Sequence, residues 1–410
     1  MRAALLSRAV FPLHDPGGME RSVYHLAKHL RGRGVETVLF TRPATESGTF
    51  PGEVVTLRYD RFPAGGHGRV LDRTLNYPGF ALRLGEAVAA RVRAGEVDVV
   101  HAQGLSGIGY ARLRRRDPAL RAPLILNPQG MEEHKTRGLK RLALFRVRSL
   151  SQETARLSDR VIATDEVTKD EVPRYLGIDP ARVVVLPNGV DLAEIDAATP
   201  ADPSRLVAQQ LPALGDASPV FVSVGRIEHY KGFGDVLEAL IRLHQEGRLP
   251  PRWAWVVIGE GTEKTALQGR IDALDAAGGG FGPHVHFAGW VRKDAELHAY
   301  YARADVFVHA THYEGSSIVT LEAMAHALPV AATRTGGIPD KVTTGENGFL
   351  VEPGDVAGLA SAIASLASDP ALRGRMGQAG RERVERAFSW DAIADRTIAV
   401  YEEMLRAARG

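Results

Sequence analysis

Two glutamates, Glu314 and Glu322, flank a short polar turn whose residue types could bind a phosphorylated sugar. Either Ser316 or Ser317 can cap a helix that runs to about residue 327. The backbone N–H groups of Ser316, Ser317 and Ile318 would then point toward a bound phosphate. A carboxylate repels phosphate but accepts hydrogen bonds from sugar hydroxyls, so the pattern indicates a nucleotide-sugar site. A single glutamate near a helix start is more typical of a capping or exposed carboxylate.

A pair of cations, Arg226 and Lys231, follows the apolar run 220–224. Ligands of open α/β sheets bind beyond the carboxyl ends of the strands, where two fixed cations would suit a diphosphate. Two solvated surface cations are the alternative. The flanking glycines, Gly225 and Gly232, favour a binding site because they let a ligand approach the backbone.

A glycine pair, Gly17 and Gly18, follows the first predicted strand and opens a predicted helix. The free N–H groups of a first helical turn favour an anion, and glycine leaves room for a ligand beside the backbone. Such a pair is also typical of a tight connection that binds nothing. The two interpretations stay open at this point.

Missing motifs narrow the chemistry. The chain has no cysteine, which excludes disulfides, thiolate metal sites and a cysteine nucleophile. It has no Asp-x-Asp motif, the usual carboxylate pair for a metal on a nucleotide diphosphate, so the balancing charge would come from Arg226, Lys231 and the helix dipole. Gly-x-Gly-x-x-Gly and P-loop motifs are also missing. We therefore expect no metal and no cofactor.

Short apolar runs alternate with helix-length amphipathic stretches in both halves of the 410-residue chain. This rhythm predicts an α/β protein with two doubly wound parallel sheets, one in each of two domains. Strands are predicted at 3–6, 35–40, 97–101, 124–127, 160–163, 183–186, 220–224, 253–258, 285–287, 306–309, 329–332 and 348–351. Helices are predicted at 19–31, 78–93, 235–245, 295–302, 318–327 and 388–408. The stretches 197–204 and 209–219, rich in Ala, Pro, Asp and Ser, predict a linker and the start of a new unit.

The charge and hydropathy of the chain indicate where the protein is located but do not identify a binding partner. The longest apolar stretch, near 253–258, is far shorter than a membrane span, and the first residues lack signal-peptide features, so we expect a cytoplasmic protein. Basic residues cluster at 112–116 and 135–148 although the net charge is only +2. Such clusters can meet phosphates, an anionic membrane or nucleic acid, or form a solvated helix face. We expect no nucleic-acid partner.

Six short motifs, in a fixed order, make the chain resemble the retaining GT-B glycosyltransferases of family 4 over nearly its whole length. Each motif is weak alone, but the ordered set is highly specific. The motifs are Pro-Gly-Gly-Met-Glu-Arg at 16–21, Asp-Val-Val-His at 98–101, Pro-Asn-Gly-Val-Asp at 187–191, Gly-Arg to Lys-Gly at 225–232, the pair Glu314 and Glu322, and Gly-Gly-Ile-Pro-Asp at 336–340.

The resemblance implies a GT-B fold, in which two Rossmann-like domains enclose a cleft. Residues 1–195 would form the acceptor-binding domain and 205–387 the donor-binding domain. Residues 388–410 would form a helix that packs back on the N-terminal domain. The reaction implied is retaining transfer from a nucleotide sugar, UDP-linked first and GDP-mannose second, to a glycan or lipid-linked hydroxyl.

The resemblance also implies roles for single residues. Arg226 and Lys231 would hold the donor diphosphate and Glu314 would contact the transferred sugar, and these three form the catalytic group. Glu322 would bind the ribose diol. The loop with Gly17 and Gly18 would face the diphosphate from across the cleft.

This sequence departs from the family pattern in two places. Gln129 stands where many relatives carry a histidine near the reacting sugar, and an amide cannot carry a proton charge. His101 and His134 are therefore acceptor-side candidates beside Gln129, although a lone histidine is usually a packed or surface residue. The second departure is Ser316-Ser317 where relatives often have Phe-Gly, and we expect these hydroxyls to cap the helix more readily than to touch donor.

Three further alternatives stay open. An amphipathic basic segment at 138–150 could lie on an anionic membrane, as peripheral contact, or pack on the core with a wet basic side. A nucleotide-sugar epimerase can share the two-domain architecture. A catalytically silent nucleotide-sugar-binding protein would explain the missing histidine.

Overall fold

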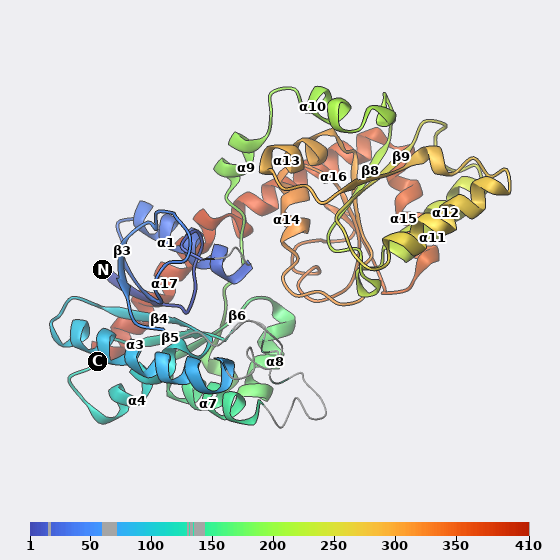
Figure 1. Ribbon diagram of the computed structural model, residues 1–410. Helices are drawn as coiled ribbons and strands as arrows, with labels where there is room; N and C mark the ends of the chain where they lie inside the picture. The colour runs from blue at the N-terminus through green and yellow to red at the C-terminus, as the bar shows by residue number, and fades with distance from the viewer. Residues whose placement is uncertain (15–17, 60–71, 129–130, 132–133, 135–143, 410) are drawn as a thin grey trace. The chain divides into compact units, whose positions relative to one another are not determined.

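The structure is a computed structural model that describes residues 1–14, 18–59, 72–128, 131, 134 and 144–409. The chain divides into two compact units, shown in Figure 1. Unit 1 contains Met1–Asn188 and Trp390–Gly410, and unit 2 contains Gly189–Ser389. Each unit is built around one parallel sheet with helices on both faces.

Unit 1 has a seven-stranded sheet in the order β3-β2-β1-β4-β5-β6-β7. The paired strands run parallel throughout. Most residues of the five inner strands are buried, as expected for a parallel sheet covered on both faces, whereas the edge strand β3 has no buried residue. The strands are β1 Arg2–Leu6, β2 Glu36–Thr41, β3 Glu53–Thr56, β4 Val99–Gln103, β5 Leu124–Asn127, β6 Arg160–Ala163 and β7 Val183–Val185.

The two faces of this sheet bury alternate strand residues against different helices. Ala4 and Val100 face one hydrophobic cluster with α3, α4, α7 and α8, whereas Ala3 and Val99 face another with α1 and α17. The helices of unit 1 are α1 Gly18–Gly32, α3 Tyr77–Arg93, α4 Ile108–Arg116, α7 Phe145–Leu157, α8 Glu166–Leu176 and α17 Trp390–Arg409, with short turns at Asp72–Asn76, Gly104–Gly107 and Pro180–Arg182.

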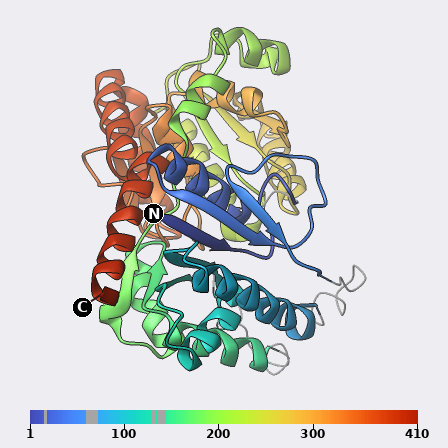
Figure 2. The same cartoon turned by 90° about the vertical axis from the view of Figure 1, so that its left-hand side faces the viewer.

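The C-terminal helix α17 is part of unit 1, where it runs beside the sheet as the red helix of Figure 2. Arg33, which directly follows α1, forms ion pairs with Asp391 and Asp395 of α17. The hydroxyl of Tyr401 lies 2.7 Å from Nδ1 of His101 in β4. These polar contacts hold the helix in register with α1 and the sheet.

Unit 2 has a six-stranded parallel sheet in the order β10-β9-β8-β11-β12-β13. Its strands are β8 Val220–Val224, β9 Ala254–Ile258, β10 Val285–Gly289, β11 Val306–His309, β12 Val330–Thr333 and β13 Gly348–Val351. Its helices are α9 Leu192–Ala198, α10 Pro203–Gln210, α11 Phe233–Gln245, α12 Lys264–Ala276, α13 Asp294–Arg303, α14 Ile318–Ala325, α15 Val356–Ser368 and α16 Pro370–Arg383, with short turns at Pro212–Leu214, His229–Lys231, Gly282–His284 and Val384–Phe388.

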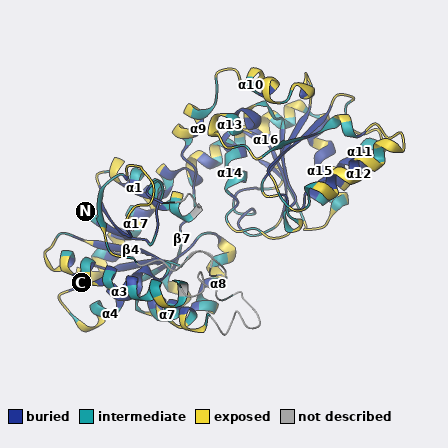
Figure 3. Cartoon of the chain, viewed as in Figure 1, coloured by how far each residue is buried: buried dark blue, intermediate teal, exposed yellow. Residues whose placement is uncertain are grey.

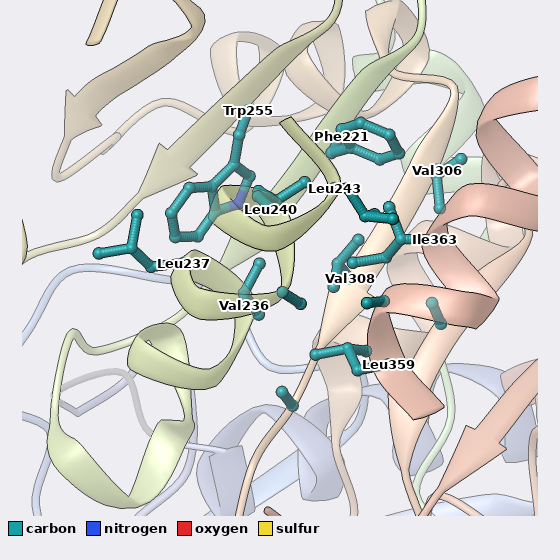
Figure 4. Packing of buried hydrophobic residues seen from close by; sticks show 14 of the residues in the cluster. Phe221, Val236, Leu237, Leu240, Leu243, Trp255, Val306, Val308, Leu359 and Ile363 are labelled. Carbon is teal, nitrogen blue, oxygen red and sulfur yellow. The ribbon is translucent and has the colours of Figure 1, made fainter. Parts of the chain in front are cut away.

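One face of the unit 2 sheet packs against α11, α12 and α15, and Figure 4 shows Phe221, Trp255 and Val308 meeting Leu240 and Ile363 there. The indole N–H of buried Trp255 donates to the Ser223 hydroxyl at 3.0 Å, and that hydroxyl donates to the carbonyl of Val308 at 2.7 Å. A buried polar group costs stability unless it is hydrogen-bonded. These two hydrogen bonds satisfy the indole N–H and the Ser223 hydroxyl, so the large indole can be buried without an unpaired polar group. Figure 3 shows buried residues along the strands of both sheets.

The predicted α/β fold with two doubly wound sheets is confirmed. The predicted linker stretches are partly helical, because 197–204 contains the end of α9 and the start of α10, and 209–219 begins with the last two residues of α10. Asp191 accepts a hydrogen bond from the N–H of Glu194, and Asp202 accepts one from the N–H of Arg205. The Asp and Pro residues that suggested a loop are N-caps and first-turn residues of short helices. Within the described parts of the chain, no helix is long and apolar enough to cross a membrane.

Candidate active site

The candidate site lies where the strand order of unit 2 reverses. The chain runs from β8 outward to β9 and β10, then returns to the other side of β8 with β11. In open α/β sheets such a switch point leaves a crevice at the carboxyl ends of the two central strands. Gly225 and Arg226 directly follow β8, and β11 ends at His309. Side chains from both strand ends therefore meet at this edge.

A cation and a histidine converge on the carboxylate of Glu314. Its Oε2 atom lies 2.8 Å from the Nζ of Lys231 and 3.0 Å from the Nε2 of His309. The side chain of Glu314 is 12% exposed, that of Lys231 is 15% exposed and that of His309 is 3% exposed. Burial alone would raise the pKa of Glu314, but the hydrogen bond and charge of His309, and the charge of Lys231, lower it to about 2. Glu314 is therefore ionised at neutral pH.

The loops that carry these side chains are bonded to each other. The hydroxyl of Thr311 donates to the carbonyl of Tyr230 at 3.0 Å, and the N–H of His312 donates to the same oxygen at 2.8 Å. Gly232 lies between Lys231 and α11 with a φ of +67°, and a Cβ there would stand 1.9 Å from the carbonyl oxygen of Ala310. Only glycine fits this conformation and this approach, so Gly232 brings Lys231 onto the end of β11.

Arg226 is held differently from Lys231. Its guanidinium contacts the hydroxyl of Tyr230 and lies 5.8 Å from the centre of that ring. The Nζ of Lys231 lies 5.5 Å from the centre of the same ring, so both cations contact Tyr230. Arg226 is exposed, which leaves donors of its guanidinium available to a ligand.

The expected capping of α14 by a serine hydroxyl is not seen in the structure. Ser317 occupies the N-cap position, but its hydroxyl is hydrogen-bonded to the hydroxyl of Thr320 at 2.8 Å, and no side chain caps the helix. The physical reason is the left-handed backbone at Ser317, with a φ of +32°, whereas a capping serine normally has an extended backbone. The Oγ of Ser316 is buried and has no hydrogen-bond partner among the described residues. Ile318 is the first residue of α14.

Glu322 projects from the second turn of the same helix. The hydroxyl of Tyr301 in α13 donates to its Oε2 at 3.0 Å. Tyr301 is fully buried, and its ring stacks on His326 with centroids 5.5 Å apart. Burial raises the pKa of Tyr301 far above its usual value, and the charge of Glu322 adds to this effect. Tyr301 is therefore a fixed hydrogen-bond donor that holds one oxygen of Glu322.

A second glycine loop packs on the backbone of Glu314. Gly336 has a φ of +52°, and a Cβ there would lie 2.2 Å from the carbonyl oxygen of Glu314. The N–H of Gly337 donates to the carbonyl of Gly315 at 2.9 Å. The loop after β12 thus packs directly against the backbone of Glu314 and Gly315, and only glycine allows this close approach.

The sequence candidates in unit 1 are only partly described by the structure. Gly18 begins α1, whereas Gly17 and Gln129 lie outside the described residues. The ring of His134 lies 5.8 Å from that of Tyr175. His101, an acceptor-side candidate from the sequence, is 2% exposed and bonded to Tyr401 of α17, and this burial argues against contact with an acceptor. Burial lowers its pKa to about 4, so it is a neutral histidine inside the sheet–helix layer.

His309, Tyr230 and Tyr301 are contacts that the sequence did not reveal. His309 could have been found from its position, since a histidine at the end of a buried strand, five residues before Glu314, faces the binding edge. Tyr230 lies between the two predicted cations. The hydrogen bond between Tyr301 and Glu322 has no signal in the sequence, because the two residues are 21 positions apart and lie on different helices.

Doubly wound units and a cation–carboxylate cluster at a switch point define a protein of the GT-B glycosyltransferase class. The family model "Glycosyltransferase Family 4" matches residues 16–194, and "Glycosyl transferases group 1" matches residues 209–383. A glycogen synthase from Mycobacterium tuberculosis is 30% identical over 96% of this chain and 92% of that protein. A D-inositol 3-phosphate glycosyltransferase from Streptomyces bingchenggensis is 32% identical over 100% of this chain and 90% of that protein. The chain belongs to glycosyltransferase family 4 and is a glycosyltransferase.

Solved structures show the same fold at lower identity. The sucrose-phosphate synthase from Thermosynechococcus elongatus matches with a TM-score of 0.68 and 24% identity, covering 99% of both chains. Anabaena HepE in complex with UDP matches with a TM-score of 0.69 and 20% identity, covering 98% of this chain and 100% of that chain. The predicted GT-B fold is confirmed.

Proposed function

We propose that this glycosyltransferase transfers a sugar from a nucleotide diphosphate to an acceptor hydroxyl with retention of configuration and without a metal ion. The observation that carries the proposal is the convergence of Lys231 and His309 on Glu314, beside exposed Arg226, at the ends of β8 and β11. Cations at this edge suit a diphosphate, and an ionised carboxylate accepts hydrogen bonds from sugar hydroxyls.

The proposed roles follow from these contacts. Arg226 and Lys231 bind the diphosphate and stabilise the charge that builds on it as the bond to the sugar breaks. The N–H groups at Ser316, Ser317 and Ile318 face the same phosphates, and the unpaired hydroxyl of Ser316 can donate to a phosphate oxygen. Glu314 orients the transferred sugar. The Oε1 atom of Glu322 accepts hydrogen bonds from the ribose diol while Tyr301 holds Oε2.

The proposed bond changes need no protein nucleophile. The acceptor oxygen bonds to the anomeric carbon on the face from which the β-phosphate oxygen departs. The acceptor proton passes to the departing phosphate, so configuration is retained and the products are glycoside and nucleoside diphosphate. The cations lower the barrier because they lie where negative charge develops.

For the donor we propose a UDP-sugar first and GDP-mannose second, and for the acceptor a glycan or lipid-linked saccharide. HepE is known in complexes with UDP and with UDP-glucose, and a starch synthase from Arabidopsis thaliana with ADP and acarbose, which supports a nucleoside diphosphate as the donor group. We place the reaction in the cytoplasm. The basic segment at 138–150, for which we propose peripheral contact with an anionic membrane, lies partly outside the described residues.

Incubation with each nucleotide sugar, with and without a panel of hydroxyl acceptors, tests the proposal. We expect nucleoside diphosphate release that depends on acceptor and persists in EDTA. Proton NMR of the product should show the anomeric configuration of the donor. An isomerised donor without transfer would favour an epimerase, and binding without turnover would favour a silent protein. Inverted configuration, or activity abolished by EDTA and restored by a divalent ion, would refute the corresponding part of the proposal.

A further inference from the structure

Unit 1 contains an arginine-lined hollow far from the carboxyl ends of its strands. Its lining includes Pro123 just before β5, Arg160 at the start of β6 and Arg182 just before β7. The hollow therefore lies at the amino edge of the sheet, opposite the edge where α/β sheets place substrates. Its volume is about 670 Å³, within the range of small-molecule sites.

The hollow carries an excess of positive charge. Its lining has five arginines and one acidic residue, Asp159; the arginines are Arg114, Arg115, Arg156, Arg160 and Arg182. Two of the five have carboxylate partners: Arg114 pairs with Asp159, and Arg160 pairs with Glu403 of α17. The other three have no carboxylate partner within the described ranges of the chain.

The unneutralised arginines are not equivalent. Arg182 donates to the carbonyls of Arg156 and Ala155 at 3.2 Å and 3.0 Å, so it caps the end of α7. Arg115, in the last turn of α4, and Arg156, in the last turn of α7, are exposed, and their side chains form no hydrogen bond or ion pair with the residues that the structure describes. Positive residues are favourable at helix C-termini, which explains their presence. It does not explain why they face one concavity, where like charges repel.

The walls leave room for a ligand. Ala407 and Ala408 at the end of α17 provide small side chains on one side, and Leu157 and Met404 provide apolar surface. A second hollow of similar size shares Arg115 and Leu157 with the first. In the second hollow Arg112 is paired with Glu153 by two hydrogen bonds of 2.8 Å and 2.6 Å. Arg115 lines both hollows and could contact a ligand in either one. Arg115 thus lies on the rim between the two.

We propose that this hollow binds a phosphate-bearing anion with two or more negative charges, gripped by Arg115, Arg156 and Arg182. The planar guanidinium presents parallel N–H groups that match phosphate oxygens, and an anion here would relieve the repulsion among the three cations. The phosphate could belong to a free phosphorylated metabolite or to a lipid headgroup. The site is separate from the donor site of unit 2, and its existence does not depend on the proposed donor chemistry.

Sodium tripolyphosphate and lipid vesicles separate these sources. Calorimetry at low salt is carried out on the full chain with Arg226→Ala and Lys231→Ala, which weakens phosphate binding at the donor site. We expect tripolyphosphate to bind this protein at one site, and Arg115→Ala with Arg156→Ala to weaken that binding at least about tenfold. When the donor site is left intact, we expect tripolyphosphate to bind at two sites, and Arg115→Ala with Arg156→Ala to reduce these to one. Flotation with phosphatidylglycerol vesicles, against phosphatidylcholine vesicles, tests the lipid source.

Arg31→Ala with Arg174→Ala is the matched control. These arginines are exposed, lie on α1 and α8, line neither hollow, and remove the same charge. A selective loss of tripolyphosphate binding in the Arg115 and Arg156 double variant supports a free phosphate ligand, and a selective loss of vesicle binding supports a headgroup. Equal behaviour of the two double variants with both probes would overturn the proposal.

Discussion

The carboxylate of Glu314 accepts a hydrogen bond of 2.8 Å from the ammonium of Lys231, although the two residues lie 83 positions apart in the chain. This bond joins the end of β11 to the loop after β8 across the switch point of the sheet. One ammonium therefore serves two anions, the carboxylate proposed to orient the sugar and the diphosphate proposed to leave.

Replacing Lys231 with alanine should lower turnover more than it weakens donor binding. The ammonium would act mainly on charge that develops in the transition state, and removing one such group typically costs about 10²–10³ in kcat. Steady-state kinetics with the active donor measures this. Lys169→Ala is the control, because Lys169 is an exposed lysine paired with Glu166 on α8 and should leave both constants unchanged. Near-normal turnover of Lys231→Ala would place the diphosphate elsewhere.

The low pKa of Glu314 predicts an acid-sensitive contribution to stability. Its pKa falls from 4.5 to about 2 in the folded protein, so its ionised contacts stabilise the fold fully above pH 4.5. This contribution is lost as the pH falls from 4.5 toward 2. The unfolding free-energy advantage of the wild type over Glu314→Gln should therefore shrink by roughly 2 kcal/mol between about pH 6 and about pH 3.

Denaturant unfolding of both proteins across this pH range measures the difference. Glu166→Gln is the control, since Glu166 is an exposed carboxylate paired with Lys169 on the surface of α8. Its stability difference from the wild type should change little with pH. A pH-independent gap between the wild type and Glu314→Gln would show that Glu314 is not held ionised by its partners.

Gly336→Ala should damage the active site, whereas Gly345→Ala should only add backbone strain. Both glycines have positive φ, but a Cβ at Gly336 would meet the carbonyl of Glu314 at 2.2 Å, and a Cβ at Gly345 has nothing within 4 Å. Each change should cost about 1–2 kcal/mol of stability from the left-handed backbone. Only Gly336→Ala should also lower kcat, by roughly tenfold or more, because it displaces the Glu314 turn. Equal kcat in the two variants would contradict this.

The strands that frame the site could be predicted because they are buried on both faces. β8 and β11 are short, mostly apolar runs, and the sequence locates both of them. β3 was not predicted, since it is a short edge strand with a charged first residue and only partly buried side chains. The start of α10, Asp202 and Pro203, looked like linker sequence because Asp and Pro favour loops and helix starts alike.

Within the site, the sequence showed which residues lie near the donor but not how they contact one another. Arg226, Lys231, Glu314 and Glu322 were named from their motifs. The left-handed backbone of Ser317 could not be foreseen, because it depends on how the Gly336 loop and β11 support the turn. The burial of His101 under α17 joins positions 300 residues apart, and no local pattern reports that packing.

Replacing Tyr301 with phenylalanine should weaken the selection of ribose over deoxyribose. The hydroxyl of Tyr301 holds Oε2 of Glu322 at 3.0 Å, and the proposed ribose contact uses the remaining carboxylate oxygen. Losing one hydrogen bond to a charged group costs roughly 1.5–3 kcal/mol, part of which should appear as weaker nucleotide binding. We expect the affinity for uridine diphosphate to fall about threefold to tenfold, and that for 2′-deoxyuridine diphosphate to change less than twofold.

Calorimetric titration of both nucleotides into the wild type, Tyr301→Phe and Tyr300→Phe measures this preference. Tyr300 is the matched control because it is the neighbouring buried tyrosine of α13 and is not bonded to Glu322. A structural role for Tyr301 alone would weaken both nucleotides equally, since a shifted α14 does not distinguish the sugars. If the wild type itself does not prefer the ribonucleotide, the ribose role of Glu322 fails, and the hydrogen bond from Tyr301 then serves only to fix α13 to α14.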